Sequence, residues 1–242
     1  MVDRNTIVGV DLLVIGAVVS ALGYIGVQSI PIAAFGFAVA IIGALVLLIV
    51  PEPIPQDAFK ALLKDSITNI EIILEETHLK EKAYFIRTDD DKVRAFIPFL
   101  AEAQVESNAN AKTLLALNKA PKRFITNYAD LKGLMLIPPG NEIVKLSKIQ
   151  KGDDLEESLR TALVGYSDLA SSVLAIEEGN RVKIQIGSPK ISSESPFFNE
   201  SLGSPVSCVA CCVVASVKGE PVRLVDEKFD RALVRLTVDV IA

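Results

Sequence analysis

The sequence lacks the short motifs by which many enzymes are recognised. It has no Gly-x-x-x-x-Gly-Lys-Ser/Thr phosphate loop, no dinucleotide-binding glycine fingerprint, no Gly-x-Ser-x-Gly and no His-Glu-x-x-His. Among its 242 residues it has one histidine, three cysteines and no tryptophan. We therefore assign no catalytic residue and no cofactor-binding residue from the sequence, and we expect no bound cofactor.

Basic residues are too few for a surface that binds nucleic acid. The chain has 25 Lys and Arg against 30 Asp and Glu, which gives a net charge of −5. Because nucleic-acid-binding domains carry a basic patch, we expect no nucleic-acid partner.

Charge is absent altogether from one long stretch near the N-terminus. No charged residue occurs from Leu12 to Val50, and a helix needs ~20 apolar residues to cross a ~30 Å hydrocarbon core. The stretch therefore predicts two membrane spans, over residues 7–27 and 31–50, with the break at Gln28, Ser29 and Pro31. A signal peptide is the competing interpretation, but its apolar core is only ~7–15 residues long.

The positive charges that flank these spans predict their orientation. Arg4 precedes the first span, Lys60 and Lys64 follow the second, and the connecting turn is uncharged. By the positive-inside rule both termini lie in the cytoplasm. We thus expect a cell-membrane protein that contacts the bilayer through residues 7–50 and exposes almost nothing outside the cell.

Small residues recur four positions apart within both spans, a spacing that lets helix backbones approach closely. We expect them to pack the hairpin on itself rather than on a second copy of the chain. The residues are Gly16, Ser20, Ala17, Ala21, Gly36, Ala40 and Ala44.

The remainder of the chain predicts an α+β fold. Residues 1–50 form the transmembrane helical hairpin, residues 51–56 a Pro-rich spacer, and residues 57–242 a cytoplasmic α+β domain. Helical periodicity followed by two strand-like runs occurs about three times, which predicts three helix-plus-β-hairpin units and a mainly antiparallel sheet. The helices are expected over 57–76, 153–164 and 205–218, and the hairpins over 83–98, 173–186 and 222–240.

The last hairpin is expected to turn around Glu227 and Lys228. A further strand pair is expected over 123–127 and 133–137, and a mobile loop or irregular helix over 102–110. Residues 190–203 are rich in Ser and Pro and predict a loop. We expect its aromatic pair, Phe197 and Phe198, to pin that loop to the core.

All three cysteines fall within one predicted helix, as Cys208, Cys211 and Cys212. Zinc normally takes four ligands, and a Cys-x-x-Cys pair at a helix start is a redox candidate. The surrounding residues make this helix apolar on every side, however, which is typical of a buried element. We therefore expect a structural role and rank a metal or redox site well below it.

Two other polar features have ordinary structural explanations. His78 follows a predicted helix end, where a cation is favourable. Asp89, Asp90 and Asp91 lack the glycine and distal glutamate of an EF-hand, so a solvated hairpin turn is expected.

Three passages resemble a group of uncharacterised small archaeal membrane proteins. They are Asp57-Ala58-Phe59-Lys60-Ala61-Leu62, Leu136-Ile137-Pro138-Pro139-Gly140-Asn141-Glu142 and Gly203-Ser204-Pro205. The resemblance implies two membrane spans followed by a cytoplasmic domain, and it implies no activity.

Three hypotheses about function follow in order of preference. The first is a membrane-anchored cytoplasmic scaffold or interaction protein without catalytic activity, with a protein partner or a second copy of itself. The second is a membrane-tethered sensor of a small ligand, whose pocket would contain convergent polar groups. The third is a redox or metal enzyme that uses Cys208, Cys211 and Cys212.

Overall fold

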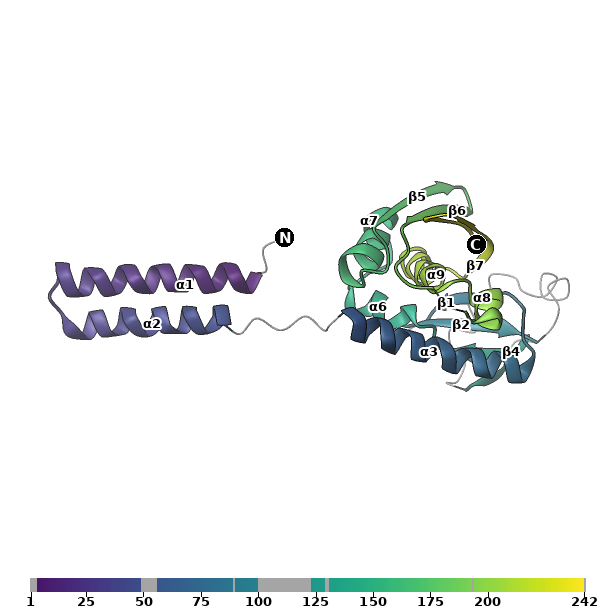
Figure 1. Ribbon diagram of the computed structural model, residues 1–242, viewed down its shortest axis with the longest axis horizontal. Helices are drawn as coiled ribbons and strands as arrows, with labels where there is room; N and C mark the ends of the chain where they lie inside the picture. Colours follow the sequence, from purple (N-terminus) through teal and green to yellow (C-terminus); the bar gives the residue numbers. More distant parts are fainter. Residues whose placement is uncertain are drawn as a thin grey trace. The chain divides into compact units, whose positions relative to one another are not determined.

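The computed structural model describes residues 4–48, 56–88, 90–99, 123–128, 131–192 and 194–241 (Figure 1). The chain divides into two compact units, Met1–Pro55 and Gln56–Ala242. Residues 51–55 of the expected spacer, Asp89 of the acidic turn and the expected irregular segment 102–110 lie outside the described residues.

The first unit is a hairpin of two apolar helices. Helix α1 (Arg4–Ala21) continues into a π-helical turn, η1 (Leu22–Gly26), and α2 (Ile30–Leu48) runs back beside it (Figure 1). Gln28 adopts a positive φ of 48° between them. The two helical segments and the break near Gln28 agree with the prediction from the sequence.

Glycines make the contact between these two helices. The fully buried positions within residues 8–46 are Gly9, Gly16, Gly23, Gly36 and Gly43. A Cβ atom added to Gly16 would overlap the backbone of Ala40, and one added to Gly36 would overlap the backbone of Ser20. Ser20 Oγ also donates a hydrogen bond to the carbonyl of Ala33, at 3.1 Å. Gly16 and Gly36 therefore pack the hairpin on itself, as expected, whereas Ala17 and Ala21 are exposed.

Two helical stretches among the described residues are long and apolar enough to cross a membrane, by length and composition alone. One is Val8–Gly26, of which 17% is buried, and the other is Pro196–Lys218, of which 94% is buried. The apolar character of the second stretch is explained by its place in the core of the second unit. The apolar stretch of α2, Ile30–Val46, is shorter.

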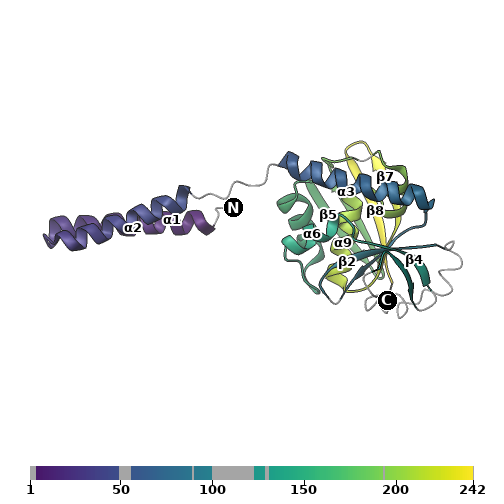
Figure 2. The ribbon, with the colours of Figure 1, turned by 90° about the horizontal axis from the view of Figure 1, so that it is seen from below.

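The second unit is α+β and contains one eight-stranded sheet (Figures 1 and 2). Its order is β3-β4-β2-β1-β7-β8-β6-β5, and every neighbouring pair is antiparallel. The strands are β1 (Tyr84–Arg87), β2 (Val93–Pro98), β3 (Ile125–Tyr128), β4 (Leu131–Leu136), β5 (Ser172–Glu178), β6 (Arg181–Gly187), β7 (Val222–Asp230) and β8 (Leu233–Val240). The mainly antiparallel sheet and the three helix-plus-hairpin repeats agree with the prediction.

The helices of this unit pack on a single core built around α9 (Pro205–Lys218). Every residue from Pro205 to Val217 is buried, and the sheet curves around this helix (Figure 1). Helix α3 (Gln56–Thr77) adds Leu63, Ile67 and Leu74 to the same core and crosses the near side of the unit in Figure 2. The other helical elements within the described residues of this unit are α6 (Gly140–Leu146), α7 (Leu155–Arg160), the π-helical turn η3 (Thr161–Tyr166) and α8 (Pro196–Leu202).

Polar groups satisfy both ends of α9. At its start, Ser204 Oγ accepts from the Ser207 amide, while the carboxylate of Glu227 accepts from the Ser204 amide at 3.0 Å and from Ser207 Oγ at 2.6 Å. At its end, Gly219 adopts a left-handed φ of 67°, and Arg87 donates to the carbonyl of Ser216 at 2.6 Å. The buried helix thus has partners for terminal backbone groups that would otherwise be unsatisfied.

The structure corrects the expected loop over 190–203, because part of it is helix α8. The carboxylate of Glu71 on α3 accepts from the amides of Phe197 and Phe198, at 3.1 and 2.6 Å. A carboxylate at a helix start satisfies free N–H groups and favours the positive end of the helix. Phe198 is fully buried and Phe197 packs against the core, so the aromatic pair pins this segment as expected.

The structure also corrects the predicted position of the turn in the last hairpin. Strand β7 continues through Glu227 and Lys228 to Asp230, and the turn lies at Arg231, whose φ is 50°. A register shift between Leu224 and Asp226 precedes the charged stretch. Helix α6 was not expected from the sequence.

We expect the glycine contact to decide the separation of α1 and α2. In the variant Gly36→Leu the new side chain would meet the Ser20 backbone, so the helices should separate toward the ~8–10 Å axis distance of ordinary helix pairs. Pulsed electron resonance between spin labels at the exposed positions Val14 and Ile41 measures the change. The control variant Ala38→Leu, on the exposed side of α2, should leave the distance unchanged. Equal distances in both variants would contradict the glycine contact.

Candidate functional site

The three cysteines lie in the buried interior of α9. Cys208, Cys211 and Cys212 are free thiols with no exposed surface. Burial, above all, raises the pKa of Cys211 and of Cys212 well above the ordinary thiol value. Since the thiolate is the reactive form, we expect the thiols of Cys211 and Cys212 to react slowly in the folded protein. Among the described residues, no group of three or more His, Cys, Asp or Glu side chains could hold a metal ion.

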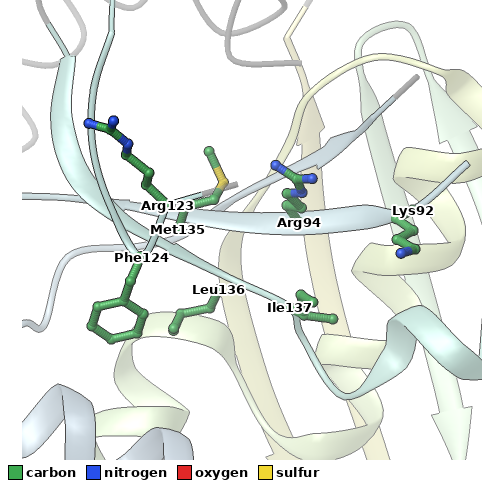
Figure 3. A pocket seen from close by; sticks show the side chains of 7 residues that line it. All are labelled: Lys92, Arg94, Arg123, Phe124, Met135, Leu136 and Ile137. Atoms are coloured by element: carbon green, nitrogen blue, oxygen red, sulfur yellow. The ribbon is translucent and has the colours of Figure 1, made fainter. Parts of the chain in front are cut away.

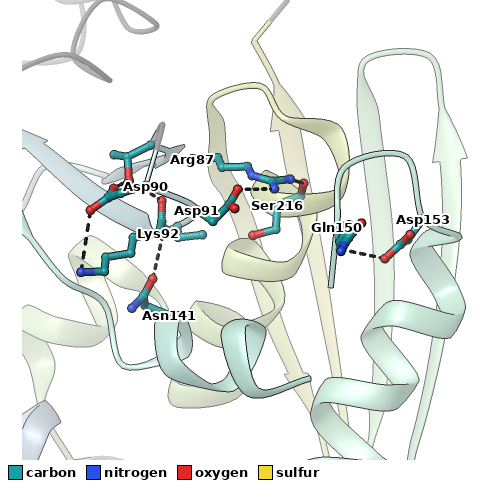
Figure 4. Close-up of polar contacts among 10 residues, drawn as sticks. Arg87, Asp90, Asp91, Lys92, Asn141, Gln150, Asp153 and Ser216 are labelled. Atoms are coloured by element: carbon teal, nitrogen blue, oxygen red, sulfur yellow. Dashed lines mark hydrogen bonds and ion pairs between the residues drawn. The ribbon is translucent and has the colours of Figure 1, made fainter. Parts of the chain in front are cut away.

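The second of the three passages that resemble archaeal membrane proteins packs against helix α9. A Cβ on Gly140 would meet Val209 and Cys212, so only glycine lets α6 approach α9 this closely. The neighbouring Asn141 is buried, and its Oδ1 accepts from the Val93 amide at 2.8 Å (Figure 4). Its Nδ2 donates to Glu142 at 3.0 Å. Gly140 and Asn141 thus join β2, α6 and α9, which is a structural role.

His78 lies at the C-terminal end of α3, exposed to solvent. It adopts a left-handed φ of 51°, and its amide donates to the carbonyl of Glu75 at 3.1 Å. This is the helix-end position expected for it.

The described part of the acidic turn is also structural. Asp91 accepts from Arg87 at 2.7 Å, and the same guanidinium donates to Ser216 on α9 (Figure 4). Asp90 accepts from the Thr88 hydroxyl and forms an ion pair with Lys92 at 3.7 Å. These contacts hold the β1–β2 turn against the end of α9.

A cavity of about 360 Å³ lies at one end of strands β2 and β4. Its seven described lining residues include three cations and no carboxylate, and the others are apolar. They are Lys92, Arg94, Arg123, Phe124, Met135, Leu136 and Ile137. The volume lies near the lower limit of the ~300–1,000 Å³ that is typical of small-molecule sites.

Two guanidinium groups face the same side of the strands at this cavity. Arg94, Arg123 and Met135 project to one side, whereas Phe124 and Leu136 project to the other (Figure 3). On β2, Val93, Ala95 and Ile97 belong to the core around α9. Because side chains alternate along a strand, Arg94 and Phe96 lie on the opposite face of the sheet.

Arg94 is the most unusual residue of the cavity. Only 7% of its surface is exposed, and it lies opposite Ile86 of β1 in the sheet. None of the described residues forms a hydrogen bond or an ion pair with its side chain. A buried charge without a partner costs several kcal/mol, so Arg94 is a candidate for contact with a ligand.

The prediction from the sequence did not identify this cavity. Arg94 does carry a signal, since it is the charged residue within the otherwise apolar strand Val93–Pro98. Arg123 carries none, because its approach to β4 depends on the pairing of β3 with β4.

We expect the cysteines to affect stability alone. Native protein should resist alkylation that runs to completion after denaturation, as followed by mass spectrometry. Replacing Cys208, Cys211 or Cys212 by serine should lower the free energy of unfolding by about 1–3 kcal/mol each, because serine buries a hydroxyl that needs a partner. Alanine should be less harmful than serine.

The pH dependence follows from the raised pKa values. The neutral thiols of Cys211 and Cys212 stabilise the folded state fully below the ordinary thiol pKa. Above it the unfolded chain ionises first, so this contribution falls as pH rises toward the folded-state pKa. When the pH is raised from neutral to alkaline, the free energy of unfolding should fall less in the double variant Cys211→Ala, Cys212→Ala than in the native protein. Rapid labelling of native protein at neutral pH would contradict this interpretation.

Comparisons with curated proteins and with solved structures found no match. One family model matches residues 2–239, with the description Domain of unknown function (DUF7982). This match covers nearly the whole chain, and the protein therefore belongs to the DUF7982 family.

Proposed function

We propose that the protein is a membrane-anchored, non-catalytic receptor whose α+β unit binds a small ligand in the cavity of β2 and β4. The observation that carries the proposal is Arg94, a buried guanidinium at the cavity with no partner among the described residues. Ligand sites of this kind are mostly apolar and contain a few polar groups that fix orientation.

The surface of the helical hairpin supports the membrane anchor. Its helices bury glycines against each other and turn large apolar side chains outward, including Ile25 with 77% and Phe35 with 67% exposed. Such a surface is unfavourable in water and suits a lipid environment. Because α2 is neutral and of similar length to α1, both helices fit as spans.

The flanking charges support an orientation in which both ends of the hairpin lie on one side of the membrane. Arg4 precedes the neutral stretch, and Lys60 and Lys64 follow it in α3. Under the positive-inside rule the α+β unit then faces the cytoplasm.

A protein partner is the second candidate, and strand β5 favours it. This strand is one edge of the sheet, and Leu174 and Ile176 on it are 46% and 47% exposed. An edge strand offers unpaired backbone groups to another chain. Glu156 already accepts from the Ala175 amide at 3.3 Å, so part of this edge has a partner within the protein.

Protease accessibility tests the orientation. Protease added to intact cells should leave the region after residue 56 undigested, whereas opened cells should lose it. An antibody against the C-terminal region follows the digestion. Digestion in intact cells would contradict the orientation that we infer from Arg4, Lys60 and Lys64.

Native mass spectrometry tests the binding function. Full-length protein extracted from its own membranes should carry a bound small molecule that denaturation releases. A spectrum of bare monomers would contradict the receptor, and a spectrum of dimers without ligand would favour the second candidate.

A further inference from the structure

We propose that the ligand of this cavity is an organic anion, a carboxylate or a phosphate attached to an apolar group, whose charge is held by Arg94 and Arg123. The inference rests on the proposed binding function and adds the chemical class of the ligand.

The charge of the lining selects an anion. Arg94, Arg123 and Lys92 are among the residues that line the cavity, and none of its seven described lining residues is acidic. Lys92 is partly compensated by Asp90, at 3.7 Å. The two arginines have no such carboxylate within the lining. A ligand that carries negative charge is therefore favoured over a neutral or cationic one of the same shape.

Arg94 differs from two other arginines of the same part of the sheet. Arg87 donates to the Ser216 carbonyl and to Asp91, and Arg223 lies 5.7 Å from the ring centre of Tyr84. Both therefore have partners within the protein. Arg94 is more deeply placed, with 7% of its surface exposed, and has none among the described residues. A guanidinium has only donors, so its missing partner is a hydrogen-bond acceptor, and an acceptor that is an anion would also balance the buried charge.

The two guanidinium groups supply donors of the kind that bind a carboxylate or a phosphate. Both groups extend to the same side of the strands, with Met135 between them in Figure 3. A guanidinium presents a planar fork of donors that matches two oxygen atoms of either anion. The thioether of Met135 offers an adaptable apolar contact beside the charged head. Of the four apolar lining residues, Met135 lies on the side of the two arginines and would contact the apolar part of the ligand, whereas Phe124 and Leu136 project to the other side.

Titration calorimetry with small probes tests the ligand class. The sample is the full-length protein in amphipol, and the probes are phenyl phosphate, benzyl alcohol, benzylamine and inorganic phosphate. Phenyl phosphate should bind at least about tenfold more tightly than benzyl alcohol, because the charged hydrogen bonds are lost with the alcohol. Benzylamine should not bind, and inorganic phosphate should bind more weakly than phenyl phosphate because it lacks the ring.

Nanodiscs distinguish a soluble anion from a lipid headgroup. If the natural ligand is an anionic lipid, phosphatidylglycerol nanodiscs should compete with phenyl phosphate, whereas phosphatidylcholine nanodiscs should not. If it is a soluble compound, phenyl phosphate should bind equally in both. Competition by the neutral phosphatidylcholine nanodiscs would contradict an anion site.

Matched variants assign the binding to the two arginines. Arg94→Met should weaken phenyl phosphate binding by about tenfold or more, and Arg94→Lys should restore part of it because the charge remains without the fork. Arg123→Met removes an exposed cation and should weaken binding several-fold without affecting the fold. The control Arg181→Met, which removes an exposed ion pair with Asp239 on β6 and β8, should bind as the native protein does.

Thermal unfolding separates a binding role of Arg94 from a structural one. In ligand-free protein, Arg94→Met should raise the unfolding midpoint by about 2–4 °C, because it removes a buried charge without a partner. Phenyl phosphate should raise the midpoint of the native protein, and at the same concentration it should raise that of Arg94→Met clearly less. A lower midpoint in Arg94→Met would show that the guanidinium has a structural partner, and would overturn the proposal.

Failure of this inference is distinguishable from failure of the receptor function. A neutral compound in the native mass spectrum, with no binding of phenyl phosphate, would overturn the anion and leave a receptor. Equal affinity of the native protein, Arg94→Met and Arg123→Met for phenyl phosphate would also overturn the anion site. If the spectrum shows no ligand but phenyl phosphate binds in a way that depends on Arg94, the anion site is supported and the receptor function is contradicted.

Discussion

The burial of α9 on every side is the constraint on which the rest of the α+β unit depends. A helix that is removed from water needs partners for its terminal N–H and C=O groups, since water cannot supply them. Glu227 on β7 serves the start of α9, and Arg87 on β1 serves the end. These two strands are neighbours in the sheet, so the sheet that packs against α9 also supplies its polar contacts. The three cysteines belong to this interior, where all of them are buried.

The two units use opposite kinds of packing. The α+β unit buries large side chains such as Phe85, Phe96 and Phe198, as a protein in water must. The helical hairpin buries glycines and turns its large side chains outward. Burial of apolar surface cannot drive the second arrangement. Close contact between backbones, together with the hydrogen bond from Ser20 to Ala33, takes its place.

Elements with a local signal could be predicted from the sequence, and those with remote partners could not. Asp154 caps α7 as its position suggests, and the alternating residues of β6 pair as expected. Helix α8, in contrast, depends on Glu71, more than a hundred residues away. The continuation of β7 through its charged residues depends on pairing with β8 and on the reach of Glu227 to α9. In the candidate site, the sequence shows Arg94 as a charged residue within an apolar strand. The cavity itself could not be predicted, because it depends on the order of β2, β4 and β3 in the sheet.

The join between β1 and β7 also constrains how the chain folds. Only two residue pairs, Tyr84 with Arg223 and Phe85 with Val222, connect the two halves of the sheet, and they link positions far apart in sequence. During synthesis, β1 therefore waits with an open edge until β7 emerges, and α9 must emerge before it. Contacts of such long sequence separation slow folding, and an open edge strand invites pairing with other chains. The two halves of the sheet thus join only when the last hairpin pairs with β1, after almost the whole unit has been synthesised.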